Sequence, residues 1–426
     1  MNLLLIDCEG LGLDIALTAL AQGHQVRHFV RDTPRTKWIG HGLVERVRSL
    51  GNHHRWADLI FITDNMKYMP TLDACRADKA CRAVWIGPDT RSARLEHDRE
   101  YGQQIMEQYG VPTAHHQSFD DYDAAIAYVK KRDTRLVSKP FGSDNKALSY
   151  AAKGPEDLIF MLKKWQREGK IKDKFILQDF VPGIEVAVGG WFDGGCFSGG
   201  FHENFEFKKL MNDDIGPATG ESGTILQVVD HSALANKVLV PFEPLLKALH
   251  YTGYFDTNCI VAKDGTPYPL EFTARPGWPT THLQLSLLRG DLLESLHATR
   301  APHFTRNKTV CGVVVTQPDY PYSHITRKEV TGIPVWGFDP ENLHHHPCEM
   351  MYKKGPDYTG YATAGDYIAC VTGHGTTISG AAESAYTNLN ALTIVNSPMW
   401  RTDIGKKLEK ELPRLQKHGW ATAFRY

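Results

Sequence analysis

The sequence of 426 residues contains no long apolar run, little net charge and few cysteines. A membrane-spanning helix needs about 20 consecutive apolar residues, and no stretch approaches that length, so we expect no membrane span. The formal net charge of -1 disfavours a general nucleic-acid or membrane-surface role, because both need a basic excess. The eight cysteines include no CxxC pair, a pattern typical of reduced, mostly buried thiols in a cytoplasmic protein.

The composition is that of an ordinary soluble globular protein, with 42% hydrophobic and 23% charged residues. The chain is too long for one hydrophobic core, and its length predicts about two to four domains. The opening segment MNLLLIDCEG has neither a basic start nor a cleavage signal. We therefore expect a first strand there and not a signal peptide.

Short apolar strands alternate with helical patterns over roughly the first 88 residues, at 3–7, 24–30, 58–63 and 83–87. This alternation predicts a parallel sheet with helices on its faces. The first turn contains Gly10 and Gly12, two of the three glycines of a dinucleotide-binding fingerprint. Two glycines are also typical of a plain strand-to-helix turn. If this turn binds a ligand, the helix N-terminus favours an anion such as phosphate.

Two stretches in the middle of the chain suggest a nucleotide site. A helix is expected from Ser92 to Gly110. The first of the two stretches follows it, a strand that carries Lys139 just before a loop of small residues. An ammonium group and several backbone N–H groups there can surround a polyphosphate, although an exposed hairpin with one lysine fits equally well. Further on, residues 178–181 lead out of an apolar strand, and Glu185 opens the next one. Such a crossing can offer backbone groups to an adenine, while Glu185 is either a ribose ligand or a solvated turn residue.

The most informative stretch is 253–281, which reads as two strands joined by an Asp264-Gly265 turn. Side chains alternate along a strand, so Asp256 and Asn258 share one face, as do Glu271, Thr273 and Arg275. Mg²⁺ takes oxygen ligands, and an arginine beside them suits a carboxylate or phosphate. An ordinary surface hairpin with a polar face is the alternative.

Taken in order, these motifs resemble the ATP-grasp fold and, more narrowly, the glycinamide ribonucleotide synthetase family. The resemblance covers nearly the full length of the chain. It is carried by the segments WIGPDTRSARLE, GVPTA, ILQDFVPGIE, NDDIGPATGESG, YTGY, GTPYPLEFTARPG, GVVV, ACVTGHG and MWRTDIGKKLE. It implies an α/β and α+β multidomain fold, with a parallel-sheet pre-ATP-grasp domain at 1–90 and a two-lobed ATP-grasp domain at 91–300, whose lid lobe covers about 113–180. A C-terminal α+β domain at 301–426 completes it.

The family resemblance implies a ligase that forms a C–N bond. ATP phosphorylates a carboxylate, and an amine then displaces phosphate from the acyl phosphate. The simplest reaction is that of glycine with phosphoribosylamine in purine biosynthesis. The alternatives are a ligase with another amine acceptor and a nucleotide-binding protein without catalysis. ATP and Mg²⁺ (or Mn²⁺) are the implied cofactors, and the partners are a small carboxylate and an amine, with no nucleic acid and no membrane. A monomer or homodimer in the cytoplasm is expected.

The resemblance also assigns site residues. Arg275 and Lys139 are the implied catalytic residues. ATP would be held by Arg99, Lys139, Ser143, Gln178, Asp179, Phe180, Val181 and Glu185, with residues 141–146 closing over the phosphates. The metal would be held by Glu271, Thr273 and Asn258, with Asp256 as a further candidate. The substrates would lie against Asp214, Gly216, Pro217, Thr219, Gly220, Arg275, Gly10 and Gly12.

The sequence departs from the family pattern at several of these positions. The family usually has Asn two residues after the metal-binding Glu, where this chain has Thr273. The Gly-Gly-Arg-Glu-His turn that helps to receive phosphoribosylamine is replaced by the segment from Glu9 to Asp14, and Gly-Pro-Glu after the third strand is replaced by Thr63-Asp64-Asn65. A basic phosphate contact is therefore lost from the acceptor pocket, and a sugar phosphate would be held less tightly.

One further cluster invites a metal interpretation, the run His344-His345-His346 with Cys348. Adjacent residues on an extended chain point in opposite directions, so three consecutive histidines seldom bind one ion. We expect a polar loop at this position.

Overall fold

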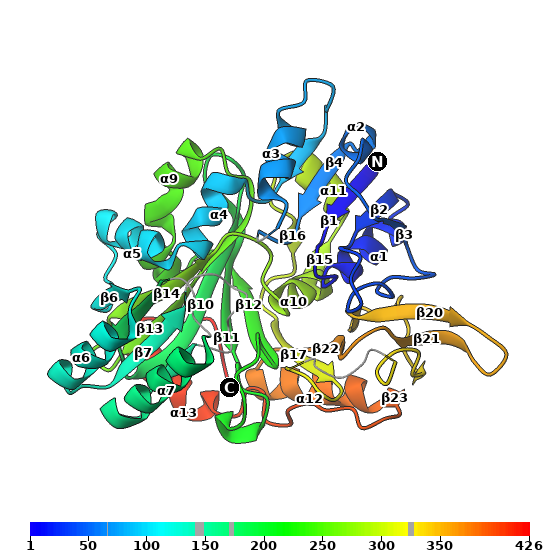
Figure 1. The fold of residues 1–426 in the computed structure, drawn as a ribbon. Helices are drawn as coiled ribbons and strands as arrows, with labels where there is room; N and C mark the ends of the chain where they lie inside the picture. The colour runs from blue at the N-terminus through cyan, green and yellow to red at the C-terminus, as the bar shows by residue number, and fades with distance from the viewer. Residues whose placement is uncertain (66, 141–148, 170–173, 323–327) are drawn as a thin grey trace.

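The computed structural model describes residues 1–65, 67–140, 149–169, 174–322 and 328–426. Its N-terminal part is a five-stranded parallel sheet in the order β3-β2-β1-β4-β5, drawn in blue in Figure 1. The strands are β1 (Asn2–Ile6), β2 (Gln25–Phe29), β3 (Glu45–Val47), β4 (Leu59–Ile62) and β5 (Val84–Ile86), and the helices between them are α1 (Leu13–Ala21), α2 (His53–Trp56) and α3 (Met69–Arg76). The parallel sheet expected from the strand pattern is confirmed.

Two short helices follow in place of the single helix expected from Ser92 to Gly110. They are α4 (Thr90–His97) and α5 (Arg99–Gln108), separated by Asp98. Asp98 has an extended backbone, and its carboxylate accepts a hydrogen bond from the N–H of Tyr101 at 3.0 Å. This residue is a helix N-cap, so it ends one helix and starts the next. The break places Arg99 at the start of α5.

A four-stranded antiparallel sheet forms a separate lobe, at the lower left of Figure 1. Its strand order is β6 (His116–Phe119), β9 (Phe175–Asp179), β7 (Leu136–Pro140) and β8 (Tyr150–Ala151), with helices α6 (Tyr122–Arg132) and α7 (Pro155–Glu168). Trp165 of α7 packs with Phe175 and Leu177 of β9 in a core of its own. The lobe is therefore an independently packed unit that brings Lys139 and Gln178 to the middle of the molecule.

The centre of the molecule is an eight-stranded antiparallel sheet. Its strands, in spatial order, are β14 (Pro267–Thr273), β13 (Gly253–Ala262), β10 (Gly183–Phe192), β11 (Phe197–Glu206), β12 (Gly223–Val229), β17 (Thr309–Thr316), β22 (Tyr367–Gly375) and β19 (His345–Pro347). The sheet continues across residue 300, where the sequence predicts a domain boundary. The division of the chain into domains stays a prediction.

Helices and small sheets surround this central sheet. The helices are α8 (Ala233–Val238), α9 (Glu243–Ala248), α10 (Thr280–Leu287), α11 (Leu292–His297), α12 (Ile378–Asn390) and α13 (Leu408–Gln416), and 3-10 turns lie at η2 (Asn212–Asp214) and η3 (Val240–Phe242). The paired small strands are β15 (Leu288–Arg289) with β16 (His303–Phe304), β18 (Val335–Trp336) with β23 (Thr393–Ile394), and β20 (Met350–Lys354) with β21 (Thr359–Thr363). Every residue of β17 is buried, as its apolar run CGVVV predicts.

The described residues contain no helix that is long and apolar enough to cross a membrane. All eight cysteines are free, and five of them are buried. The mixed α/β and α+β fold, with a parallel N-terminal sheet and a large antiparallel sheet, is therefore the one that the sequence predicts.

Candidate functional site

A cavity of about 320 Å³ lies between the N-terminal sheet and the central sheet, and we call it the central cavity. One wall comes from the β13–β14 hairpin and another from the loop after β1. The floor includes Glu206 and Lys208 at the end of β11, and Gly220 and Glu221 just before β12. Acidic and basic groups from distant parts of the chain thus face one space.

The β13–β14 hairpin presents its polar residues to this cavity. Asp256 pairs with Thr273 and Asn258 pairs with Glu271 across the two strands, with a bulge directly after Asn258. Residues directly opposite each other lie on the same face of a sheet. All four line the central cavity together with Arg275, which confirms the shared face predicted from the strand alternation.

Glu271 lies among basic side chains. It accepts a short hydrogen bond from Arg99, which begins α5. Burial alone would raise the pKa of Glu271, but the charges of Arg99 and Lys208 lower it well below the usual range. The carboxylate is therefore ionised at any physiological pH. The acid expected to hold a metal and the base expected to hold a phosphate thus neutralise each other.

Lys139 reaches the same region from the lobe. Its ammonium donates to the side-chain oxygen of Gln178 at 2.9 Å. Burial, together with the charge of Arg99, lowers the pKa of Lys139 to about 8. The charges of Glu185 and Glu271 act in the opposite direction on this lysine. The carboxylates of Glu185 and Glu271 are therefore close enough to Lys139 to act on its charge.

Lys208 is a basic residue of the site that the sequence motifs did not single out. Its ammonium forms a short hydrogen bond with Glu185 and lies 3.1 Å from an oxygen of Glu206. Burial would lower its pKa, but these two carboxylates raise the pKa of Lys208 well above the usual value. The lysine stays charged and supplies a third cation to the site, beside Arg99 and Lys139. No spacing in the sequence links it to the hairpin.

Oxygen donors suitable for a divalent cation gather around Glu271. The Asn258 amide nitrogen faces both carboxylate oxygens of Glu206 at 3.2 Å, and the amide oxygen then points away from that carboxylate. One carboxylate oxygen of Asp256 is buried without a hydrogen-bond partner. Burial and the charge of Glu206 raise the pKa of Asp256 well above its usual value. A hard cation bound here would meet carboxylate, amide and hydroxyl oxygens, the donors that Mg²⁺ takes.

The expected adenine segment, residues 178–181, runs from the end of β9 toward β10. Gln178 is buried and also donates to Ala114 at 3.3 Å. Arg132 donates to both carboxylate oxygens of Asp179 at 2.6 and 2.7 Å. The Arg135 guanidinium lies 3.4 Å from the ring centroid of Phe180. Val181 is partly buried. Ser143 and the rest of the expected phosphate loop, residues 141–146, lie outside the described residues.

The expected acceptor residues separate into two groups. Gly220 and Arg275 line the central cavity, and Arg275 donates to Glu96 at 2.9 Å. Asp214 instead pairs with Arg401 at 2.7 Å and Lys407 at 3.1 Å. Gly216, Pro217 and Thr219 form the turn between Asp214 and Gly220. The carbonyl of Pro217 accepts from the N–H of Leu210, the hydroxyl of Thr219 donates to the carbonyl of Lys208, and Gly216 has a φ of 81°. The structure thus ties the predicted loop to the C-terminal segment.

The N–H groups of the glycine-containing turn after β1 are bonded within the chain, unlike those of the anion-binding turn that the glycines suggest. Gly10 has a φ of 82°, and a Cβ there would lie 2.6 Å from Ile39, so a glycine is required. The N–H groups of Leu11 and Gly12 donate to the carboxylate of Asp7 at 3.1 and 2.7 Å. The chain's own aspartate therefore occupies the start of α1, where the sequence allowed a phosphate.

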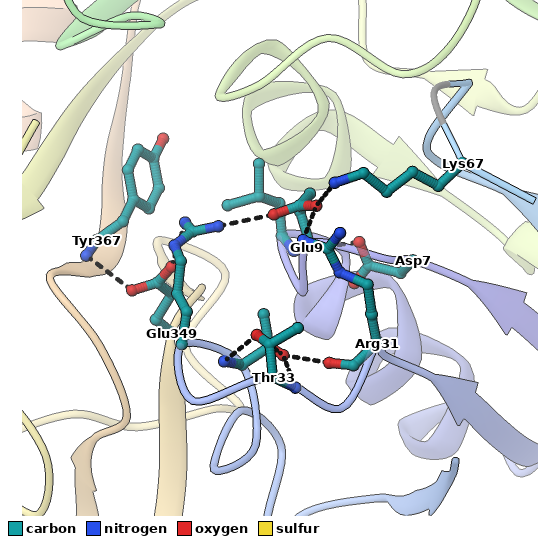
Figure 2. Close-up of polar contacts among 10 residues, drawn as sticks. Asp7, Glu9, Arg31, Thr33, Lys67, Glu349 and Tyr367 are labelled. Atoms are coloured by element: carbon teal, nitrogen blue, oxygen red, sulfur yellow. Dashed lines mark hydrogen bonds and ion pairs between the residues drawn. The ribbon is translucent and has the colours of Figure 1, made fainter. Parts of the chain in front are cut away.

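Glu9, in the same turn, collects three basic side chains. Figure 2 shows Arg31 and Lys67 directed at its carboxylate, at 2.9 and 3.5 Å. Arg35 reaches the other oxygen at 2.8 Å and, through its second nitrogen, the buried Glu349 at 2.7 Å. Glu9 and Arg35 both line the central cavity. Sequence reasoning missed this cluster, because Arg31, Arg35 and Lys67 fall in no recognisable motif.

The prediction of a polar loop at the histidine run is wrong. His345 and His346 are buried in β19. His346 and His282 of α10 both contact one oxygen of Asp14 through Nδ1, at 2.8 and 3.1 Å, and these three ligand atoms lie within 4.8 Å of one another. The Nε2 atoms contact Thr372 at 3.0 Å and the Cys348 sulfur at 3.3 Å. Both ring nitrogens of His282 and of His346 thus have a polar partner, and the group joins α1 to the central sheet. Phe338 stacks on His345, and Asp14 of α1 and His282 of α10 lie against His346, so tertiary packing buries a segment that its polarity alone places at the surface.

Known proteins resemble this chain over most of its length. Residues 97–281 match the family model of the phosphoribosylglycinamide synthetase ATP-grasp (A) domain. The phosphoribosylamine-glycine ligase of Ralstonia nicotianae is 24% identical over 338 residues, which cover 76% of this chain and 78% of the relative. The enzyme of the same name from Neisseria meningitidis serogroup B is 26% identical over 350 residues, with coverage of 76% and 78%.

Solved structures show the same arrangement. The crystal structure of phosphoribosylamine-glycine ligase from Thermotoga maritima superposes with a TM-score of 0.73 at 19% identity, covering 95% of this chain and all of the other. The biotin carboxylase domain of Hydrogenobacter thermophilus 2-oxoglutarate carboxylase, in complex with MgADP, superposes with a TM-score of 0.66 at 12% identity, covering 99% and 96%. The chain therefore has the ATP-grasp fold, residues 97–281 match the ATP-grasp domain model, and over most of its length the chain resembles the phosphoribosylamine-glycine ligases.

Proposed function

We propose that this protein is an ATP-dependent ligase that joins a carboxylate to an amine through an acyl phosphate, with glycine and phosphoribosylamine as the substrates. The observation that carries the proposal is the convergence of Arg99, Lys139 and Lys208 on Glu271 and Glu185. Three cations suit a triphosphate. The carboxylate of Glu271 among them, with further oxygens on the same hairpin, suits the metal that accompanies the triphosphate. Relatives of similar length carry this activity in their names.

The chemistry requires positioning and charge neutralisation more than an enzyme nucleophile. A carboxylate oxygen of the acid attacks the γ-phosphorus, and the bond to the β-phosphate oxygen breaks, releasing ADP. The amine nitrogen then attacks the carbonyl carbon, and the C–O bond breaks as phosphate leaves with its electron pair. The amine proton passes to phosphate or to solvent. Arg99, Lys139 and Lys208 would hold the phosphate oxygens, and Glu185 would hold the ribose once Lys208 turns to the nucleotide.

The residues of the central cavity fit a divalent cation. Glu271, Asn258 and Thr273 would hold it, with Glu206 as an additional carboxylate that compensates for neutral Thr273. Mg²⁺ bound there supplies neutralisation of phosphate charge. Arg275 would face the carboxylate of the acid or its acyl phosphate. Its pairing with Glu96 fixes the guanidinium at the cavity wall, so it presents its remaining donors to the cavity without having to be ordered at each turnover.

Release of ADP that depends on glycine and phosphoribosylamine together tests the proposal. We expect turnover only when ATP, Mg²⁺ and both substrates are present, and a product whose mass equals the two substrates less one water. ADP formation with phosphoribosylamine but no dependence on glycine would refute the assignment of the acid. That the chain is a monomer or a homodimer stays a prediction, which sedimentation would test. Its cytoplasmic location also stays a prediction, which imaging of the tagged chain would test.

A second candidate keeps the ligase chemistry and changes the amine. It is favoured by Asp7, whose carboxylate accepts from the N–H groups of Leu11 and Gly12 at the acceptor end of the central cavity, because these donors are then taken by the chain itself and not offered to a sugar phosphate. ADP formation with glycine and a panel of amines, compared with phosphoribosylamine, separates the two candidates. A protein that binds nucleotide without catalysis is the third possibility, and ADP formation that disappears in the Glu271→Ala variant would exclude it.

A further inference from the structure

A second and larger cavity, of about 1150 Å³, lies outside the central cavity, and we call it the basic cavity. One wall is the segment between β2 and β3, and the other includes the β20–β21 hairpin (Figure 1). Its volume is comparable to that of pockets that enclose whole small molecules, which are about 300–1,000 Å³. None of the residues assigned to the ATP or metal site lines it.

The charge of this cavity is of one sign. No aspartate or glutamate is among the described residues that line it, whereas six basic side chains do so: Arg31, Arg35, Lys37, Lys328, Lys353 and Lys354. Arg31 and Arg35 pair with Glu9 behind the wall. Within the described part of the chain, the four lysines form no ion pair. Four uncompensated ammonium groups around one space favour a ligand with several negative charges.

An aromatic surface accompanies the charge. Trp38 lines the cavity with 37% of its surface exposed. His41 packs edge-on against it, with the ring centroids 5.3 Å apart, and the Lys37 ammonium lies 5.4 Å from the indole centroid. A large aromatic side chain left partly open between cations offers a face on which a flat ring can stack. Charge and ring together match a nucleotide better than a simple polyphosphate.

Backbone contacts hold the two walls together. The N–H of Gly40 donates to Met350 at 2.8 Å, and the N–H of Tyr352 donates to His41 at 2.8 Å. Gly42 has a φ of 73°, and a Cβ there would lie 2.7 Å from the Tyr352 oxygen. The segment after β2 therefore continues beside β20 at a distance that only glycine allows. The two walls of the cavity are therefore joined by backbone contacts.

We propose that the basic cavity binds a nucleoside polyphosphate, at a site separate from the one that holds ATP for the ligase reaction. The phosphates would lie between Lys353 and Lys354 on one wall and Lys37 on the other, with the base on Trp38. A nucleic acid strand is a weaker match, because strand binding needs an extended basic groove. The six basic residues all line the basic cavity, and the whole chain has a net charge of -1. Arg35 lines both cavities, so the ligand would be sensed at the acceptor end of the central cavity.

The test is titration of the full chain with GTP, and separately with inorganic tripolyphosphate, while tryptophan fluorescence is recorded. We expect GTP to quench a signal that the Trp38→Phe variant lacks, and tripolyphosphate to bind more weakly because it has no ring. The double variant Lys353→Ala, Lys354→Ala should bind GTP about ten-fold more weakly or worse. The matched double variant Lys163→Ala, Lys164→Ala removes the same charge from the exposed face of α7 and should bind GTP as the unmodified chain does.

The result has clear alternatives. Equal GTP affinity in the two double variants would overturn the proposal, as would a loss of GTP binding confined to Lys139→Ala, because GTP would then occupy the ATP site. Tighter binding of a short single-stranded oligonucleotide than of GTP, lost with the same lysines, would assign the cavity to nucleic acid instead. Lys37→Gln, on the opposite wall, repeats the test should the double variant fold poorly. None of these measurements uses ligase turnover, so the proposal about the basic cavity can be tested even if the proposed ligase reaction is wrong.

Discussion

Arg99 donates a hydrogen bond to Glu271 although the two residues are 172 positions apart in the chain. Arg99 stands at the start of a short helix, and Glu271 lies on the edge strand β14 of the central sheet. A base expected to bind phosphate thus neutralises an acid expected to bind metal. Nucleotide that binds Arg99 would free Glu271 for the metal, and metal that binds Glu271 would free Arg99 for the nucleotide. We therefore expect nucleotide and metal to bind cooperatively.

The Glu271→Gln variant tests this relationship. It keeps the shape of the side chain and removes its charge, so we expect ADP formation to fall about 100- to 1,000-fold. Metal-free ADP should bind at least as tightly as before, because Arg99 is released from its carboxylate. Turnover assays and calorimetric titration with ADP in the presence of chelator measure the two effects. Glu294→Gln, at an exposed position on α11, is the matched control, and unchanged turnover in Glu271→Gln would contradict the metal assignment.

Lys139 gives the nucleotide affinity a pH dependence. Its pKa is about 8 in the folded protein, below the usual value for lysine, and a bound phosphate favours the charged form. ADP should therefore bind tightly below pH 8 and lose affinity as the pH rises through and above that value, by up to about ten-fold per pH unit. In the Lys139→Arg variant the guanidinium stays protonated, so the affinity should be flat over the same range. A wild-type profile that is equally flat would place the lysine away from the phosphates.

Thr273 limits how tightly the metal is expected to bind. A threonine hydroxyl is a shorter and weaker oxygen ligand than the amide of the asparagine usual in the family. Thr273→Asn should therefore reduce the Mg²⁺ concentration for half-maximal turnover, by about three- to ten-fold. Thr273→Ser keeps a hydroxyl and should leave that concentration unchanged. A rise in the Mg²⁺ requirement of Thr273→Asn would mean that Glu206, and not residue 273, completes the metal site.

The hairpin of the candidate site could be predicted because its information is local. An Asp-Gly turn and the two-residue period of a strand suffice to place Glu271 beside Asn258. The order of the motifs then predicts that Lys139 and Glu185 bind the same ligand as this hairpin. Asp98 is a different case. Its capping of α5 competes with continuation of α4, and a helical pattern alone cannot decide between them.

Residues whose role depends on distant partners could not be predicted. Asp214 was expected to face a substrate, but it pairs with Arg401, which is 1% exposed and also holds Asp403. That partner lies 187 residues away, and no local pattern encodes the contact. Glu9 and Lys208 were missed for the same reason, since each is one charged residue among many until the fold brings its partners close. The histidine run was misplaced because burial is set by neighbouring strands and not by side-chain polarity.

Asp14 links the start of α1 to the far edge of the central sheet, and its removal should loosen that link. Burial alone would raise its pKa, but His346 and His282 lower the pKa of Asp14 to about 2. A depressed carboxylate pKa contributes stability that is complete above the unfolded value near 4 and is lost as the pH falls toward 2. Asp14→Asn should therefore lower the apparent melting temperature by several degrees at pH 7. The gap from wild type should shrink between pH 4 and pH 2, whereas Asp120→Asn, at an exposed position, should melt like wild type throughout. A gap that persists at pH 2 would mean that Asp14 acts through packing and not through its charge.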